Sequence, residues 1–416
     1  MDSRTSNLVL IGIVIAIVLA FASVALFGEA MTSVEWLGTL FLKALKMIIV
    51  PLVMASMIVG VTGLGDVRRL GRLGGTTVLY FAVTTGIAVT IGLVMVNLLQ
   101  PGVGVNIAGM EVPENIAAKE AITLADLVLS LVSDNIVASM ADMELLPVIL
   151  FSLVFGAVLT TIGPAGQTVV DFFRGLNDVM MKLVMLLMLV APFGIFGLVA
   201  GRFARAGDVG ELIGGLGLYM LTVIAALAIH GLVVLPAILW IFGRRNPVIY
   251  LFNMATALLT AFSTASSSAT MPLTIQGVEK HNRVSEKAAG FVIPLGATVN
   301  MNGTALYEGI AAMFIAQALG LDLGPGQQVI VLLTATLAAI GAAGIPEAGL
   351  VTMVIVLNAV GLPIEGIGLI LAVDWLLDRF RTTVNVWGDA CGAAVVEQQV
   401  LRTREAGDAA RAAGAA

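Results

Sequence analysis

The chain has very few of the residues that build disulfide-rich domains or soft-metal centres. Among 416 residues it has one cysteine, Cys391, and two histidines, His230 and His281. A single cysteine excludes a disulfide framework, and so few soft ligands argue against a metal centre of the His/Cys type. No organic cofactor is expected.

Charged residues are also scarce. They make up 12% of the chain, whereas 59% of the residues are hydrophobic. A soluble domain carries about a quarter charged residues, so this composition predicts an integral membrane protein surrounded by a lipid bilayer. The net charge of -6 is modest and gives no reason to expect a nucleic-acid partner.

Long apolar runs predict membrane helices. The first run, Leu8–Phe27, is long enough to cross a bilayer and longer than the core of a signal peptide. The further runs are Trp36–Gly63, Thr76–Leu99, Leu145–Ile162, Val184–Val199 and Leu212–Phe242. Lysines and arginines collect in alternate loops and acids in the loops between them. The positive-inside bias therefore places the amino terminus and the even-numbered loops in the cytoplasm.

Two later apolar runs are interrupted. Val248–Gln276 is broken by Ser266–Pro272, and folding back would keep the cationic loop at 280–287 inside. Val329–Pro363 is broken by Gly341–Gly349, and its acidic flanks indicate that both ends lie outside. Two opposed re-entrant hairpins make an inverted repeat, the architecture of secondary transporters. We expect an all-α membrane protein with eight transmembrane helices, two re-entrant hairpins and both termini in the cytoplasm.

One predicted membrane helix carries a face of charged and polar residues, about 80° wide. Its members are Asp374, Asp378, Arg381, Thr382, Asn385 and Asp389. Charges at membrane depth normally face a protein interior or a water-filled cavity and mark a substrate or ion path. Acids beside an arginine can bind both ends of a zwitterion. The alternative interpretation is an internally paired, structural ion network.

Other polar residues interrupt the run before this helix. Asn300-Met301-Asn302-Gly303-Thr304 predicts local unwinding, which frees oxygen ligands suited to Na⁺; a glycine kink with back-bonded Asn and Thr is the alternative. The Ser266–Ser268 tip could hold a carboxylate, although small polar residues also serve helix packing. Glu308 is expected either to carry a proton or to form a buried ion pair with an arginine.

These motifs, in this order and spacing, resemble the glutamate transporter family (dicarboxylate/amino acid:cation symporters). The matching stretches are Leu45–Leu52, Ser266–Thr270, Gly296–Glu308, Gly341–Gly349 and Asp374–Asp389. The resemblance runs nearly end to end and implies a homotrimer with an elevator mechanism. It implies a scaffold at residues 1–75 and 101–205, a transport domain at 76–100 and 206–398, and a cytoplasmic tail at 399–416.

The resemblance also implies roles for single residues. Asp378 would take the ammonium group of the substrate and Arg381 its side-chain carboxylate. The remaining substrate contacts would be Thr304, Thr382, Asn385 and the tip serines Ser266, Ser267 and Ser268, with Gly349 closing the lid. One sodium ion would use Gly296, Asn300, Asn385 and Asp389, and a second Thr298, Met301, Ile340 and Ala342. Glu308 matches a proton-carrying residue of the vertebrate members.

The chain departs from the family pattern at a third sodium site. Thr84 and Thr85 remain, but the family tyrosine is Phe81 here and the family aspartate is Asn302. We therefore expect fewer coupled sodium ions than in three-ion members. Ala265 and Arg379 follow the arrangement of members that counter-transport potassium. Glu347, beside the outer lid, has no assigned role.

Together these features predict a secondary active symporter of glutamate or aspartate, driven by sodium and a proton, in a prokaryotic inner membrane. A C4-dicarboxylate or neutral amino acid symporter of the same family is the alternative, and a substrate-gated anion channel is the alternative from a different class. An enzyme is disfavoured because the serine cluster has no nearby histidine and Gly388-Asp389 lacks the Gly-x-Gly-Asp form.

Overall fold

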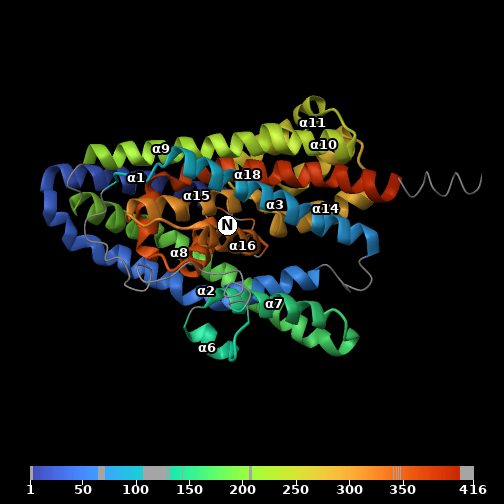
Figure 1. Cartoon of the computed structure of the whole chain (residues 1–416), viewed down its shortest axis with the longest axis horizontal. Helices are drawn as coiled ribbons and strands as arrows, with labels where there is room; N and C mark the ends of the chain where they lie inside the picture. Colours follow the sequence, from blue (N-terminus) through green and yellow to red (C-terminus); the bar gives the residue numbers. More distant parts are fainter. Residues whose placement is uncertain are drawn as a thin grey trace, which may run out of the picture.

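The computed structural model is a bundle of long helices that lie side by side (Figure 1). It describes residues 3–63, 71–105, 129, 132–142, 144–205, 209–340, 342, 344, 346 and 348–402. Within these residues there is no β-strand, so the prediction of an all-α protein is confirmed. Glu347, most of the predicted tail and several loop charges lie outside the described residues.

The described residues of the amino-terminal half form four long helices and several short ones. They are α1 (Ser3–Phe27), η1 (Gly28–Val34), α2 (Glu35–Gly63), α3 (Gly71–Leu99), α6 (Ile136–Ala141), α7 (Leu145–Leu159), η2 (Gly163–Gly166) and α8 (Gln167–Arg205). The start of α8 differs from the prediction, which began this helix at Val184. Polar residues such as Asp171 and Arg174 lie exposed on its first turns, so the helix continues beyond the apolar run.

The carboxyl-terminal half is more finely divided. Its elements are α9 (Val209–Ile229), η3 (His230–Val234), α10 (Leu235–Gly243), α11 (Pro247–Asn253), α12 (Ala255–Thr264), α13 (Ser267–Gln276), η4 (Gly277–His281), α14 (Glu286–Val299), α15 (Asn302–Ala318), α16 (Pro325–Ala339), α17 (Ala348–Ala359), η5 (Ile364–Gly366), α18 (Ile367–Val396) and η6 (Glu397–Arg402). In Figure 1, α9 follows the upper edge of the bundle and α7 the lower edge.

Three helical stretches in the described part are long and apolar enough to cross a membrane. They are Ile11–Ala44, Arg72–Leu99 and Gly214–Gly243, and two bent helix pairs would raise the number to five. The shorter and the polar-interrupted helices cannot be recognised as membrane spans from length and composition alone. The expected eight crossings therefore stay a prediction.

Glycines bring the helices of the bundle into close contact. A Cβ atom on Gly197 of α8 would lie 2.8 Å from the backbone nitrogen of Gly38 on α2. A Cβ on Gly92 of α3 would lie 2.9 Å from the backbone oxygen of Leu306 on α15. Lipid chains are as apolar as the side chains, so helices in a membrane associate largely by such close packing. Two packed groups result, one of α1, α2, α7 and α8 and one of α3, α9 and α14 to α18.

The first interrupted run folds back as a hairpin, as predicted. The chain turns between α12 and α13 at Ala265, whose φ of 49° lies in the left-handed region. Ser266 then caps α13, because its Oγ accepts a hydrogen bond from Ala269 N at 3.2 Å. Asn253 Nδ2 donates to Asn282 Oδ1 at 3.0 Å, so the two ends of the hairpin meet at the same side.

The second interrupted run forms another hairpin, from α16 and α17, which pack against each other. Between the two hairpins the predicted break also occurs: α14 ends at Val299, and Asn300 and Met301 are not helical. The Asn300 side chain donates to Asp389 Oδ1 at 2.9 Å rather than back to its own helix. Local unwinding, and not a back-bonded kink, is therefore the correct interpretation.

Replacing Gly92 by valine is expected to lower thermal stability. The new side chain would push α3 away from α15, and overpacking of this kind typically costs about 1–3 kcal/mol. Gly86, on the same helix, has no heavy atom within 4 Å of an added Cβ, so Gly86→Val is the matched control. The measurement is the midpoint of thermal unfolding of detergent-purified protein. Equal midpoints for the two variants would contradict the packing argument.

Candidate functional site

A buried arginine between two carboxylates forms the centre of the polar face of α18. Arg381 has no solvent-exposed surface, and Asp374 and Asp378 are 2% and 6% exposed. Arg381 Nη1 lies 2.8 Å from Asp374 Oδ1, and Nη2 lies 2.7 Å from Asp378 Oδ1. Ions taken out of water need such partners, because the desolvation cost is several kcal/mol per ion. With both acids ionised, the three groups carry one net negative charge.

The same guanidinium contacts two further elements. Its Cζ lies 3.9 Å from the ring centroid of Tyr307 on α15, a cation–π geometry. Gly349, at the start of α17, packs against it so closely that an added Cβ would lie 3.2 Å from Nη1. Arg381 Nε is buried and has no hydrogen-bond partner among the described residues. The arginine thus keeps an unused donor beside the second hairpin.

Asn385 joins α18 to the break before α15. Its Oδ1 accepts hydrogen bonds from Gly303 N at 2.8 Å and Thr304 N at 3.4 Å. Its Nδ2 donates to Thr304 Oγ1 at 3.0 Å. These bonds satisfy backbone N–H groups that a helix start leaves without partners. Asn385 and Thr304 are therefore neighbours, as the predicted site requires.

A second polar group surrounds Asp389, one helical turn beyond Asn385. Asn300 donates to its carboxylate, and Gly296 packs so tightly against it that any Cβ would overlap the carboxylate oxygens. Asn300 Oδ1 is buried without a hydrogen-bond partner in the described part. A carboxylate and an unused amide oxygen are hard ligands, so this group fits an alkali cation.

The residues of the third sodium site do not fit a cation equally well. Thr84 Oγ1 donates to the backbone oxygens of Tyr80 at 2.8 Å and Phe81 at 3.2 Å. Asn302 Oδ1 already accepts a bond from Gly303 N at 3.0 Å, and its buried Nδ2 has no acceptor in the described part. An amide N–H repels a cation where a carboxylate would attract it.

The tips of the two hairpins touch each other. Ser266 Oγ donates to Gly344 O at 2.6 Å, and Ser268 N donates to the same oxygen at 3.1 Å. Arg379 of α18 holds the first hairpin near its tip, since Nη1 donates to Ser263 O at 2.6 Å. The two hairpins and α18 therefore form one connected structure around the buried charges.

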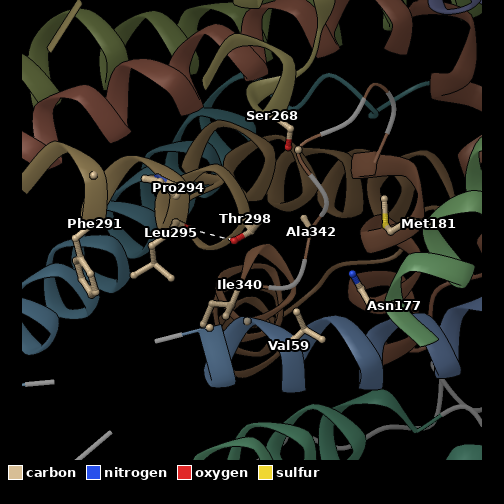
Figure 2. A pocket seen from close by; sticks show the side chains of 14 residues that line it. Val59, Asn177, Met181, Ser268, Phe291, Pro294, Leu295, Thr298, Ile340 and Ala342 are labelled. Carbon is tan, nitrogen blue, oxygen red and sulfur yellow. Dashed lines mark hydrogen bonds between the residues drawn. The ribbon is translucent and has the colours of Figure 1, made fainter. Parts of the chain in front are cut away.

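A cavity of about 470 Å³ lies beside this contact between the tips. Figure 2 shows Thr298 of α14 facing Ile340 and Ala342 of the second hairpin, with Asn177 and Met181 of α8 on the other side. Three residues of the predicted second sodium site, Thr298, Ile340 and Ala342, thus line one cavity. Met301 is buried nearby in the chain but is not among the lining residues.

Glu308 is completely buried on α15. One of its oxygens accepts a short hydrogen bond from Thr352 Oγ1 of α17. Among the described residues its second oxygen has no hydrogen-bond partner, and no arginine lies within ion-pair distance of it. The ion-pair alternative for Glu308 therefore does not occur within the described part of the chain.

The structure does not bring every predicted substrate-binding residue into contact with the Arg381 guanidinium. Ser267 and Thr382 are buried, at 4% and 5% exposed, but among the described residues no hydrogen bond joins their side chains to the Arg381 guanidinium. Two residues without a predicted role contact the predicted ones: Tyr307 contacts Arg381, and Thr352 donates a hydrogen bond to Glu308. Tyr307 directly precedes Glu308 in the matching motif, which was a usable signal. Nothing in the sequence pointed to Thr352, because it depends on how α17 packs against α15.

The architecture defines the class of protein. Two re-entrant hairpins and an unwound helix around buried charges in a membrane bundle are characteristic of secondary transporters. The chain matches the model of the sodium:dicarboxylate symporter family over residues 6–399, and it belongs to that family. Its members are transporters and not enzymes, with sodium as the coupled ion.

Named relatives agree with this family. The chain is 43% identical to excitatory amino acid transporter 3 of Oryctolagus cuniculus, covering 87% of this chain and 78% of the relative. It is 41% identical to the human protein of that name, covering 94% of this chain and 86% of the relative. It is 40% identical to human neutral amino acid transporter B(0), covering 92% and 77% of the two chains.

Replacing Asn385 by alanine is expected to destabilise the protein. The change leaves Thr304 N without its acceptor Asn385 Oδ1 and removes the bond to Thr304 Oγ1, while Gly303 N keeps only Asn302 Oδ1. An unsatisfied buried donor typically costs about 1–3 kcal/mol. Asn358, whose buried Nδ2 has no partner in the described residues, provides the control Asn358→Ala. Thermal unfolding midpoints of the two variants are the readout. A midpoint for Asn385→Ala at or above that of the control would refute the argument.

Proposed function

We propose that the protein is a sodium-driven symporter of acidic amino acids, with glutamate and aspartate as substrates. The observation that carries the proposal is the buried Arg381 beside Asp378, which offers a guanidinium and a carboxylate within one α18 turn. An acidic amino acid has the complementary pair, a second carboxylate and an ammonium group. Relatives named as excitatory amino acid transporters support this substrate class.

The ion pairs around Arg381 do not by themselves separate a substrate site from a structural ion network. Three features favour the substrate site. Within the described residues Arg381 has an unused Nε donor, the second hairpin covers it with Gly349, and the tip of the first hairpin lies against the second. A purely structural network would need neither a hairpin as its cover nor an unsatisfied donor.

The substrate would bind by exchange of partners. Its side-chain carboxylate replaces an aspartate on Arg381, and its ammonium group takes the released Asp378 carboxylate. The backbone carboxylate then receives donors from the first hairpin tip and from the start of α15. The further contacts are assigned to Ser266, Ser267, Ser268, Thr304, Thr382 and Asn385, with Gly349 as part of the lid.

Sodium would compensate the charge that the substrate brings. The Asp374–Arg381–Asp378 group already has a net negative charge, and an acidic amino acid adds another. The Asp389 carboxylate is a third negative charge. One cation at Gly296, Asn300, Asn385 and Asp389 and a second at Thr298, Met301, Ile340 and Ala342 would reduce the three negative charges to one. Coupling follows from this compensation because neither the anion nor the cations are stable alone in a low-dielectric interior.

The proposed movement is an elevator motion. The group of helices α3, α9 and α14 to α18, with the first hairpin, would form the transport domain at 76–100 and 206–398. The group α1, α2, α7 and α8 would form the scaffold of a homotrimer at 1–75 and 101–205. We assign the protein to the inner membrane, with both termini and the tail at 399–416 in the cytoplasm.

The function is tested by uptake of labelled glutamate and aspartate into proteoliposomes, with Na⁺, H⁺ and K⁺ gradients imposed one at a time. Accumulation that requires an inward sodium gradient is expected for both substrates. Accumulation of succinate or serine in preference to glutamate would instead support the dicarboxylate or neutral amino acid alternatives. A current without substrate accumulation would support a channel.

Replacing Arg381 by cysteine is expected to shift preference from aspartate toward serine. Losing one partner of a desolvated charge pair typically costs about 2–5 kcal/mol, which is roughly thirtyfold or more in affinity. The readout is competition by unlabelled aspartate and serine for uptake. Arg174, an exposed arginine paired with Asp171, gives the control Arg174→Cys. An unchanged ratio of aspartate to serine affinity in Arg381→Cys would overturn the assignment of this residue.

Replacing Asn302 by aspartate is expected to make uptake depend more steeply on sodium. The added carboxylate supplies the charge that a third cation needs beside Thr84 and Thr85. The reversal potential of coupled uptake in proteoliposomes reports the number of sodium ions per substrate. The wild-type protein should show the smaller number, and an equal number in both proteins would disprove the idea.

Replacing Glu308 by glutamine is expected to remove proton coupling. Glutamine keeps the hydrogen bond from Thr352 and the shape of the side chain but cannot exchange a proton. At a fixed sodium gradient, an inward proton gradient should stimulate wild-type uptake and leave the variant unchanged. Equal stimulation of both proteins would rule Glu308 out as the proton carrier.

A further inference from the structure

An open recess lies where α10 ends and α11 begins, away from the buried charges of α18. Its volume is about 380 Å³, and its lining residues are Trp240, Arg244, Arg245, Asn246 and Pro247. Figure 1 shows α10 and α11 at the upper right, near the end of α18. The proposed transport function assigns no role to this recess.

The two arginines of the recess differ in their partners. Arg245 forms an ion pair with Glu397, Nη2 to Oε2 at 2.9 Å, and donates to Asn282 O at 3.2 Å. Arg244 is exposed, and in the described part of the chain its guanidinium forms no ion pair or hydrogen bond. The recess therefore carries one positive charge that the described protein does not compensate.

The recess also offers neutral hydrogen-bond donors. Asn246 Oδ1 is used within α11, because it accepts from Val248 N at 3.0 Å and Ile249 N at 3.2 Å. Its amide nitrogen is left as a donor. Trp240 is 67% exposed and brings an indole N–H. One guanidinium and two neutral donors together suit an anion with several acceptor oxygens, such as a phosphate.

Large apolar side chains surround this polar recess. Those exposed on α10 and α11 are Trp240, Ile241, Phe242, Val248, Ile249 and Phe252. The recess follows the last residue of the candidate span Gly214–Gly243, so it lies at the height where acyl chains give way to headgroups. The positive-inside bias places this end in the cytoplasmic leaflet.

We propose that this recess binds the phosphate headgroup of an anionic phospholipid of the cytoplasmic leaflet. Arg244 contacts the phosphate, Asn246 and Trp240 donate hydrogen bonds to it, and the acyl chains lie along the apolar side chains of α10. A free phosphate ion would contact only the polar residues of the recess, whereas a phospholipid would also contact the apolar side chains that surround it. The headgroup of a zwitterionic lipid also contains a cation, which Arg244 would repel.

The lipid would attach to the segment that leads from α10 through α11 into the first hairpin. Asn253, at the end of α11, is hydrogen bonded to Asn282 beyond that hairpin. A headgroup held at Arg244 would therefore be linked to the base of the hairpin in this conformation of the protein. This inference concerns lipid binding alone and does not depend on the proposed substrate.

Quenching of tryptophan fluorescence by brominated lipids tests the proposal. The full-length protein is reconstituted in phosphatidylcholine vesicles that contain either brominated phosphatidylglycerol or brominated phosphatidylcholine at equal mole fraction. We expect stronger quenching by the phosphatidylglycerol, and Trp240→Phe should remove the difference. Equal quenching of the wild-type protein by the two lipids would overturn the proposal.

Arg244→Gly removes the charge and keeps the backbone, because Arg244 has a φ of 51° and glycine adopts this conformation without strain. We expect an apparent affinity for phosphatidylglycerol about fivefold lower, as for the loss of one basic residue at an anionic surface. Arg244→Lys should restore most of it. Arg283→Gly is the matched control, since Arg283 is exposed, has a φ of 54° and does not line the recess.

Two outcomes would overturn the site. Equal loss of affinity in Arg244→Gly and Arg283→Gly would mean that anionic lipid is attracted by the whole surface and not by the recess. Removal of the phosphatidylglycerol-specific quenching by inorganic phosphate, but not by chloride at the same ionic strength, would assign the recess to a free anion. Elution of each variant as the wild-type species in size-exclusion chromatography confirms that the comparison is between folded proteins.

Discussion

The cost of burying the Arg381 guanidinium explains much of the arrangement around it. An unpaired cation in the interior of a membrane protein is very unfavourable, so Asp374 and Asp378 must lie within ion-pair distance. All three are on α18, which therefore has to face the interior of the bundle. Tyr307 and Gly349 complete the enclosure from α15 and α17. The buried guanidinium thus has partners from three separate elements, α18, α15 and α17.

The same constraint connects the charges to the irregular backbone. Asn385 and Asp389 continue the polar face of α18. Asp389 contacts Asn300 in the break between α14 and α15, and Asn385 contacts Gly303 in the first turn of α15. Irregular backbone is stable at membrane depth only where protein or a cavity surrounds it. Here the Asp389 carboxylate holds the Asn300 side chain of the break, and Asn385 accepts from the backbone N–H groups that follow it. Substrate and cation groups in the proposed mechanism share this single helix face, which gives a physical route for their coupling.

The hairpins were predictable from two signals together, the breaks at Ser266–Pro272 and Gly341–Gly349 inside the apolar runs and the charges that flank those runs. The cations of the loop at 280–287, and the acids at both flanks of the second hairpin, indicated that each segment starts and ends on the same side of the membrane. Both segments do fold back. The break at Asn300 and Met301 was predictable from polar residues that an apolar helix cannot satisfy. The start of α8 was not, because exposed polar residues allow a helix to continue past its apolar run. The candidate site was predicted only in part. Helical spacing placed the polar residues of α18 on one face, but it did not show which residues of other elements contact that face.

Local patterns therefore settled the helical class, the membrane setting, the reversals and the polar face of α18, because periodicity and charge bias act along the chain itself. Packing decided the rest. Only the folded bundle places Thr352 on Glu308, joins Ser266 to Gly344, and aligns Thr298 with Ile340 and Ala342 along one cavity. These partners are far apart in the chain, and their meeting depends on close approach of glycine-lined helices, which no local pattern encodes.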